Sequence, residues 1–427
     1  MKKVFNQIIN SKFVKNVIIM ALGFTGAQTL NILLSPVITR LYGPEAFGIM
    51  GTFNAFTQIF VSVAALTYPI AIVLPKNDHD ARSLINLSIY ISLFIAIIST
   101  VIVFIFEENI VNMFKINEIA PFLYYLIPIV IIFAGIMQSL EQWLIRKKKF
   151  LINARVTFLQ SLITNSSKIG IGLFYPTATV LVFLQAFSNG LKAFMMMLFV
   201  KDWRKKNSTN KEYLEIKQLA KKYIDFPLYR APEVFIYSVS QNIPVLLLSS
   251  LFGPASAGFY NIGRTVLGLP SNLIGQAIGD VFYSRVSEAA NNNEDLNYII
   301  KKATITLFLI GLLPFGLVIL FGPFLFEVVF GKEWFTAGEY ARWIALSSYA
   351  VFINKPSVRA LPVLRAQRFQ LVFTILILIG QVISLSIGFF VFKNDIIALA
   401  LFGTTGALFN IILVLITLNK SKKLIRI

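Results

Sequence analysis

The stretch "RLYGPEAFG", residues 40–48, lies between two long apolar runs, and "SLFGPASAG" repeats its pattern at residues 250–258. Both copies contain Leu, then an aromatic residue, then Gly-Pro, and end in Gly. Gly tolerates positive φ and Pro fixes its own φ, so Gly-Pro favours a tight turn where a helix ends. The repeat predicts an internal duplication, with a helix corner after the first helix of each half.

A second pair of segments supports the duplication. "LIRKKKF" at 144–150 and "VLRAQRF" at 363–369 share an Arg and a Phe at equivalent positions. Each is expected to follow the fourth helix of its half. Two matches in the same order are stronger evidence than one.

Composition predicts an all-α polytopic membrane protein. Of 427 residues, 56% are hydrophobic and 14% are charged, and the mean hydropathy is +0.73. Runs of about 20 apolar residues recur, each long enough to cross a hydrocarbon layer of about 30 Å. Without cysteine and with one histidine, the chain has no thiolate nucleophile, disulfide or multi-histidine metal site. No catalytic residue, metal or cofactor is expected.

Twelve transmembrane helices are predicted, six on each side of the basic segment around 201–223. Their ranges are 16–36, 47–74, 82–106, 121–143, 156–175, 177–200, 232–252, 258–284, 302–326, 340–362, 370–392 and 396–418. Because six is even, both halves enter the membrane in the same orientation, which is a parallel repeat. The expected domains are an N-terminal six-helix bundle (1–200), a basic cytoplasmic linker (201–230) and a C-terminal six-helix bundle (231–427).

The distribution of Lys and Arg predicts that both termini are cytoplasmic, because these residues accumulate in short cytoplasmic loops. On this assignment the loops of the opposite side keep only Arg40, Lys115, Lys332 and Lys393. The same topology accounts for the net charge of +19, with attraction to anionic lipid as a second effect. Nucleic-acid binding is not expected.

Polar side chains follow one face of the first two helices in each half. They include Gln28, Asn31, Asn54, Gln58, Ser238, Asn242, Asn261, Arg264, Asn272, Gln276 and Asp280. Polar groups in lipid are costly, so this symmetry favours a hydrated central cavity between the halves. The alternative is hydrogen bonding between helices across dry contacts.

Charged residues inside the spans are further candidates. Arg264, Lys168 and Lys192 either face a polar cavity or extend to the interface. Four residues, Glu141, Arg230, Glu233 and Asp280, are placed near the cytoplasmic rim, where they form ion pairs, a gate or a proton-coupling site.

Two segments resemble a known family. "PVITRLYGPEAFG" at 36–48, followed by "YPIAIVLPKNDHDAR" at 68–82, resembles the amino-terminal signature of Wzx-type polysaccharide flippases. Residues 237–283 resemble the matching region of the second half. These flippases belong to the multidrug/oligosaccharidyl-lipid/polysaccharide exporter (MOP) superfamily, which implies two six-helix bundles around a central cavity.

The resemblance also implies a cargo and a compartment. Family members translocate undecaprenyl-pyrophosphate-linked oligosaccharide repeat units across the bacterial inner membrane, by alternating access, beside glycosyltransferase or polymerase partners. On this hypothesis, Arg264, with Lys168 or Lys192, binds the pyrophosphate. Six amide side chains contact the sugars: Gln28, Asn31, Asn54, Gln58, Asn272 and Gln276.

Three alternatives remain. A cation-coupled multidrug exporter predicts a deep carboxylate, whereas the acidic residues here lie at expected rims and loops. A peptidoglycan-precursor flippase commonly has two more helices. A polysaccharide polymerase or ligase, which is an enzyme, usually has a large basic periplasmic loop that this chain lacks. The sugar, the coupling ion and the oligomeric state are left open.

Overall fold

The computed structural model describes residues 12–114, 123–200, 215–292, 294–364 and 366–424. These residues form helices and turns, and none of them lies in a β-strand. The chain divides into two compact units, Met1–Leu246 and Leu247–Ile427. The predicted boundaries at 200 and 231 fall partly outside the described residues and stay a prediction.

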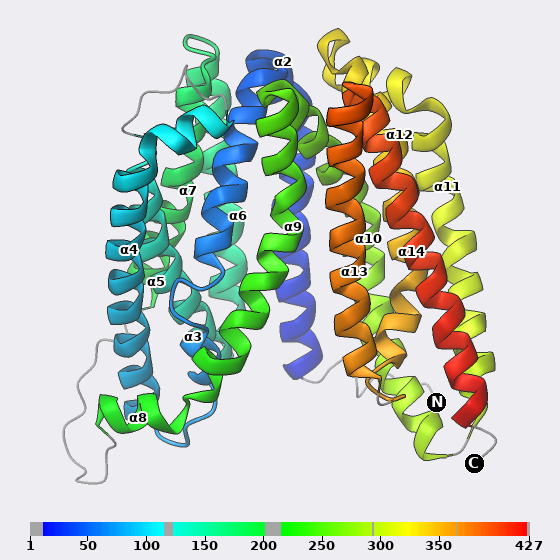
Figure 1. The fold of residues 1–427 in the computed structure, drawn as a ribbon. Coiled ribbons are helices and arrows are strands. Elements are labelled where there is room, and N and C mark those ends of the chain that lie inside the picture. The colour runs from blue at the N-terminus through cyan, green and yellow to red at the C-terminus, as the bar shows by residue number, and fades with distance from the viewer. Residues whose placement is uncertain (1–11, 115–122, 201–214, 293, 365, 425–427) are drawn as a thin grey trace. The chain divides into compact units, whose positions relative to one another are not determined.

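The first unit is a bundle of long helices (Figure 1). Its elements are α2 (Lys12–Val61), α3 (Tyr68–Ala71), α4 (Asp78–Phe114), α5 (Leu126–Arg146), α6 (Phe150–Gly172), α7 (Ala178–Phe199), α8 (Ile216–Lys222), the π-helix η3 (Phe226–Arg230) and α9 (Ala231–Phe252). Helix α2 packs on α6, α4 packs on α5, and α7 packs on both α5 and α6. The unit boundary falls inside α9.

The second unit repeats this packing order. Its elements are α10 (Pro254–Asn291), α11 (Leu296–Phe330), the 3₁₀ helix η4 (Lys332–Trp334), α12 (Phe335–Ala360), α13 (Gln367–Ile387), the π-helix η5 (Gly388–Phe392) and α14 (Asp395–Leu424). Helix α11 packs on α12, and α14 packs on both α12 and α13. These contacts parallel those of α4, α5, α6 and α7.

Both Gly-Pro corners predicted from the sequence are confirmed. Gly43 has φ 70° and ψ 172°, which kinks α2 just before Pro44. Gly253 has φ 100° and ψ 171°, and α10 begins at Pro254. An L side chain rarely adopts these angles, so each corner requires glycine. The two halves therefore share the same helix corner, a glycine with positive φ followed by proline, at equivalent positions.

The helix predicted at 47–74 is wrong as a single helix. Helix α2 ends at Val61, turns follow, and α3 covers only Tyr68–Ala71. Leu66 and Thr67 have positive φ values of 45° and 58°. Pro69 contributes to this break, because it has no N–H with which to continue the helical hydrogen bonds. The other predicted ranges lie largely on helices wherever the structure describes them.

Within the described residues, seven helical segments are long and apolar enough to cross a membrane. They are Asp78–Asn109, Leu126–Arg146, Ala178–Phe199, Phe226–Phe252, Leu296–Phe330, Val372–Phe392 and Asp395–Lys422. Large apolar side chains on α4 point away from the protein, including Phe94 at 60% exposure and Phe104 at 72%. Such a surface is stable against lipid and unfavourable in water. The chain is a multi-pass membrane protein.

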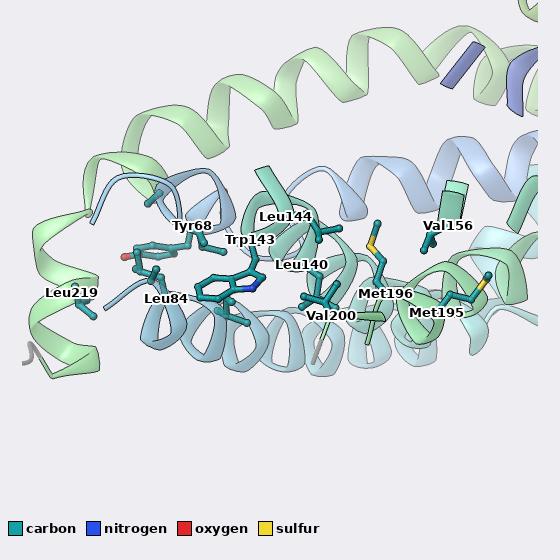
Figure 2. Close-up of a cluster of buried hydrophobic side chains, with 14 residues drawn as sticks. Tyr68, Leu84, Leu140, Trp143, Leu144, Val156, Met195, Met196, Val200 and Leu219 are labelled. Carbon is teal, nitrogen blue, oxygen red and sulfur yellow. The ribbon is translucent and has the colours of Figure 1, made fainter. Parts of the chain in front are cut away.

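A buried hydrophobic cluster fixes one end of the first unit (Figure 2). Trp143 of α5 is fully buried there, between Tyr68 and Leu84 on one side and Met196 of α7 on the other. Leu219 brings the short helix α8 into the same cluster. The end of α5, the broken segment after α2 and the linker helix are therefore packed together.

Arg146, the last residue of α5, holds the chain just after α3. Its guanidinium donates to the carbonyl oxygens of Ile72 (3.3 Å), Pro75 (2.6 Å) and Lys76 (3.3 Å), and Nε donates to Asp78 Oδ1 at 3.0 Å. A planar guanidinium has five donors in a fixed geometry, so one side chain can satisfy a whole turn of carbonyl groups.

Candidate functional site

Helix α6 carries a buried polar stripe, of which only Lys168 was predicted from the sequence. Its members are Asn153, Thr157, Gln160, Ser161, Thr164, Asn165 and Lys168, most of them buried. The spacing of three and four residues places them on one helix face. The signal is present in "NARVTFLQSLITNSSK" at 153–168, where polar residues recur every three or four positions.

Asn31 of α2 faces this stripe. Its side-chain oxygen accepts hydrogen bonds from Ser161 Oγ at 2.5 Å and Asn165 Nδ2 at 2.6 Å. The rest of the Asn31 side chain is exposed, whereas both donors are buried. Asn31 is thus oriented by α6 and still reaches the surface of the unit.

Lys168 ends the α6 stripe and is only 8% exposed. Its ammonium donates to Gln185 Oε1 of α7 at 2.8 Å. Its backbone carbonyl accepts a hydrogen bond from the Tyr42 hydroxyl at 2.8 Å, which attaches the first Gly-Pro corner to α6. A buried ammonium needs hydrogen-bond partners, and here the partner is a neutral amide.

Lys192 and Glu141 form an ion pair between α7 and α5. Nζ and Oε1 are 2.7 Å apart, and the side chains are 14% and 26% exposed. Separate roles were predicted for these residues, Lys192 at the pyrophosphate and Glu141 at the cytoplasmic rim. The structure brings them together, two turns along α7 from Gln185.

The amide side chains predicted on α2 differ in exposure. Gln28 and Asn54 are half-buried and Gln58 is exposed. The backbone carbonyl of Gln58 accepts a hydrogen bond from Ser238 Oγ of α9 at 3.1 Å. All three remain available for contact with a ligand at the surface of the first unit.

In the second unit, Arg264 is half-buried on α10, with Asn261 one turn before it. Helix α10 also includes Asn272, Gln276 and Asp280, but their side chains lie outside the described part of the structure. The predicted central cavity between the halves stays a prediction.

Arg230 and Glu233 form an exposed ion pair of 2.8 Å at the start of α9. With Asp225, Phe226 and Tyr229 they line an open hollow of about 270 Å³ beside η3. An ion pair was one of the roles expected for these two residues. Exposed pairs are worth at most about 1 kcal/mol, so this contact can break at little cost.

Comparison with known proteins identifies the family. Residues 37–339, more than half of the chain, match the family described as polysaccharide biosynthesis protein. The chain belongs to this family. A relative, the succinoglycan biosynthesis transport protein ExoT of Rhizobium meliloti (strain 1021), is 22% identical over 354 residues, which are 79% of this chain and 67% of that protein.

Solved structures with the same fold are membrane transporters. An inward-facing multidrug resistance MATE family transporter of the MOP superfamily has a TM-score of 0.75 at 14% identity, over 95% of this chain and 99% of that chain. The lipid II flippase MurJ, in an inward closed conformation, has a TM-score of 0.70 at 16% identity, over 94% and 87%. The family resemblance inferred from the sequence is confirmed, and the superfamily fold with it.

Proposed function

We propose that the protein is a flippase that moves undecaprenyl-pyrophosphate-linked oligosaccharide repeat units across the bacterial inner membrane for surface polysaccharide biosynthesis. The observation that carries this proposal is membership of the polysaccharide biosynthesis family in a chain with a transporter fold. The named activities of ExoT and MurJ, succinoglycan transport and lipid II flipping, support the same cargo class. The glycosyltransferases and polymerase of the pathway are the proposed partners.

The proposed arrangement has twelve spans and cytoplasmic termini. Besides the seven apolar segments, two spans are proposed in α2 and one each in α6, α10 and α12. The distribution of Lys and Arg supports the orientation.

The chemistry of the cargo explains the polar interior. A glycan pyrophosphate cannot cross hydrocarbon alone, because its hydroxyls and charges would lose water without replacement partners. Arg264, Lys168 and Lys192 are the proposed contacts of the pyrophosphate. The proposed sugar contacts are Gln28, Asn31, Asn54, Gln58, Asn272 and Gln276. The polyprenyl chain stays in the lipid.

Alternating access is the proposed mechanism, with the two halves rocking around the bound head group. Glu141, Arg230, Glu233 and Asp280 are the proposed gate or coupling residues. The Arg230–Glu233 and Lys192–Glu141 pairs support this role, because both join charges that a head group or a moving helix can separate.

Deletion of the gene tests the proposal. Lipid-linked repeat units should accumulate on the cytoplasmic face, and export should return with the wild-type gene. Arg264→Ala, expressed at the wild-type level, should export less glycan, and Arg40→Ala is its control at an expected outer end. Normal export by Arg264→Ala removes Arg264 from the site. Normal export in the deletion strain contradicts the flippase function.

A second candidate is a cation-coupled multidrug exporter, which the likeness to the MATE fold favours. It predicts that the deletion strain becomes sensitive to cationic drugs and keeps its surface glycan. The two phenotypes separate the candidates in one strain.

A further inference from the structure

The ion pair between Lys192 and Glu141 joins two helices of the first unit near one end. Glu141 lies five residues before Arg146, the last residue of α5, and Lys192 lies seven before Phe199, the last of α7. Both side chains are largely buried, with Lys192 14% exposed and Glu141 26% exposed. The pair thus lies about one and a half to two turns inside the unit, at the end where Arg146 and α8 gather.

Each member of the pair has unused hydrogen-bonding capacity. An ammonium has three donors and a carboxylate has about four acceptor positions. Within the described residues, the ammonium of Lys192 and the carboxylate of Glu141 make one hydrogen bond, with each other. Buried ion pairs are favourable only when further hydrogen bonds satisfy the remaining donors and acceptors. Lys192 is therefore left able to take a partner with more acceptor oxygens.

The backbone beneath the pair is fixed, so a change of partner needs only side-chain rotation. Leu140, Trp143 and Leu144 of α5 lie in the buried cluster beside Glu141, and Met195 and Met196 of α7 lie there beside Lys192 (Figure 2). The four-carbon stem of lysine can move its ammonium by several ångströms from a fixed Cα.

We propose that Glu141 is an internal counter-ion which a diphosphate head group displaces from Lys192. This inference rests on the proposed function. A diphosphate carries more charge and more acceptor oxygens than one carboxylate, so it satisfies more donors of Lys192 than Glu141 does. A monophosphate or a neutral glycan gains less by the exchange. Glu141 thereby sets a threshold for binding at Lys192, because only a head group whose contacts with Lys192 outweigh those of Glu141 breaks the pair.

Lys168 provides the contrast within the same unit. Its partner is the neutral side chain of Gln185, and among the described residues no carboxylate lies within ion-pair distance of it. Competition between a carboxylate and the head group is thus proposed for Lys192 and not for Lys168.

Binding of farnesyl diphosphate and farnesyl monophosphate to the purified full-length protein tests the proposal. Glu141→Gln should bind the diphosphate about tenfold more tightly, a difference of about 1.4 kcal/mol. Its affinity for the monophosphate should rise by no more than this factor, because a ligand too weak to displace Glu141 gains only its own contact with Lys192. Lys192→Gln should weaken binding, and adding Glu141→Gln to it should change nothing further.

Two further variants make the result independent of folding. Glu141→Asp keeps the charge on a shorter side chain and should give an intermediate affinity. Glu294→Gln breaks the exposed pair with Arg285 in the second unit and should bind as the wild type does. The thermal midpoint of each variant is measured in parallel.

The possible failures are distinct. Wild-type affinity in Glu141→Gln, together with weaker binding in Lys192→Gln, overturns the counter-ion role and leaves the proposed flippase intact. Wild-type affinity in Lys192→Gln, or no diphosphate binding by any form of the protein, removes the head-group contact itself and overturns the inference with it.

Discussion

Arg342 of α12 donates from Nε to the carbonyl oxygen of Ile319 in α11, at 2.8 Å. Ile319 lies four residues before Pro323, which has no N–H to complete the helical hydrogen bond. The guanidinium of one helix thus replaces the donor that proline removes from its neighbour. Arg342 therefore has a structural role at the proline of the neighbouring helix.

Arg342→Met should lower the free energy of unfolding by about 1–3 kcal/mol, because the carbonyl of Ile319 loses its charged donor. Adding Pro323→Ala should restore much of this loss, since alanine supplies the missing N–H. Thermal unfolding in detergent measures both. If Pro323→Ala lowers the midpoint equally in wild type and in Arg342→Met, the two residues are not coupled in this way.

Gly338→Ala should destabilise the protein strongly. Helices α11 and α12 cross so closely that a Cβ on Gly338 would lie 2.4 Å from the carbonyl oxygen of Gly322. Backbone atoms cannot move aside cheaply, so a loss of about 1–3 kcal/mol or more is expected. Gly316→Ala on α11 is the matched control, because nothing lies within 4 Å of its Cβ position. Similar yields and midpoints for the two variants would contradict the close crossing.

Arg146→Met should loosen the segment after α3, because four carbonyl groups and one carboxylate lose their shared donor. The chain has no cysteine, so Asn77→Cys gives a single labelling site in that segment. Maleimide should react faster at this site in the Arg146→Met background. Lys148→Met, which removes an exposed cation two residues away, should leave the rate unchanged. Equal rates in both backgrounds would show that Arg146 does not hold the segment.

Gly253→Ala isolates the cost of the second corner. The space around its Cβ position is empty, so only the positive φ of 100° opposes a side chain. A loss of about 1–3 kcal/mol is expected from backbone strain alone. Thermal unfolding should place this variant between wild type and Gly338→Ala. An unchanged midpoint would mean that the corner can relax to a negative φ.

The corners and most helix ranges were predictable because they depend on local chemistry. Gly-Pro after an apolar run can adopt few backbone conformations, and runs of about 20 apolar residues have the length of a lipid-spanning helix. The break after Val61 was missed although Pro69 signals it, because the residues around it are as apolar as a continuous span. Mean hydropathy indicates whether a segment is surrounded by lipid or by water, and it does not detect a turn within an apolar segment.

The candidate site was less predictable because pairing depends on tertiary contacts. The sequence identified Lys192 and Glu141 as unusual charges, but 51 positions separate them, and only the packing of α5 on α7 brings them together. Asn31 was predicted to lie on a polar face, but its partners Ser161 and Asn165 were not, because Lys168 was the only residue of their helix predicted to have a polar role.

The hydrogen bond from Tyr42 ends on the backbone of residue 168 and not on its side chain. The first corner is therefore attached to α6 in a way that any amino acid at position 168 preserves. Gly172 has no such freedom, because a Cβ there would lie 2.7 Å from the Tyr42 ring. Position 168 can thus accept another side chain without losing this attachment, whereas position 172, one turn away, has room for glycine alone.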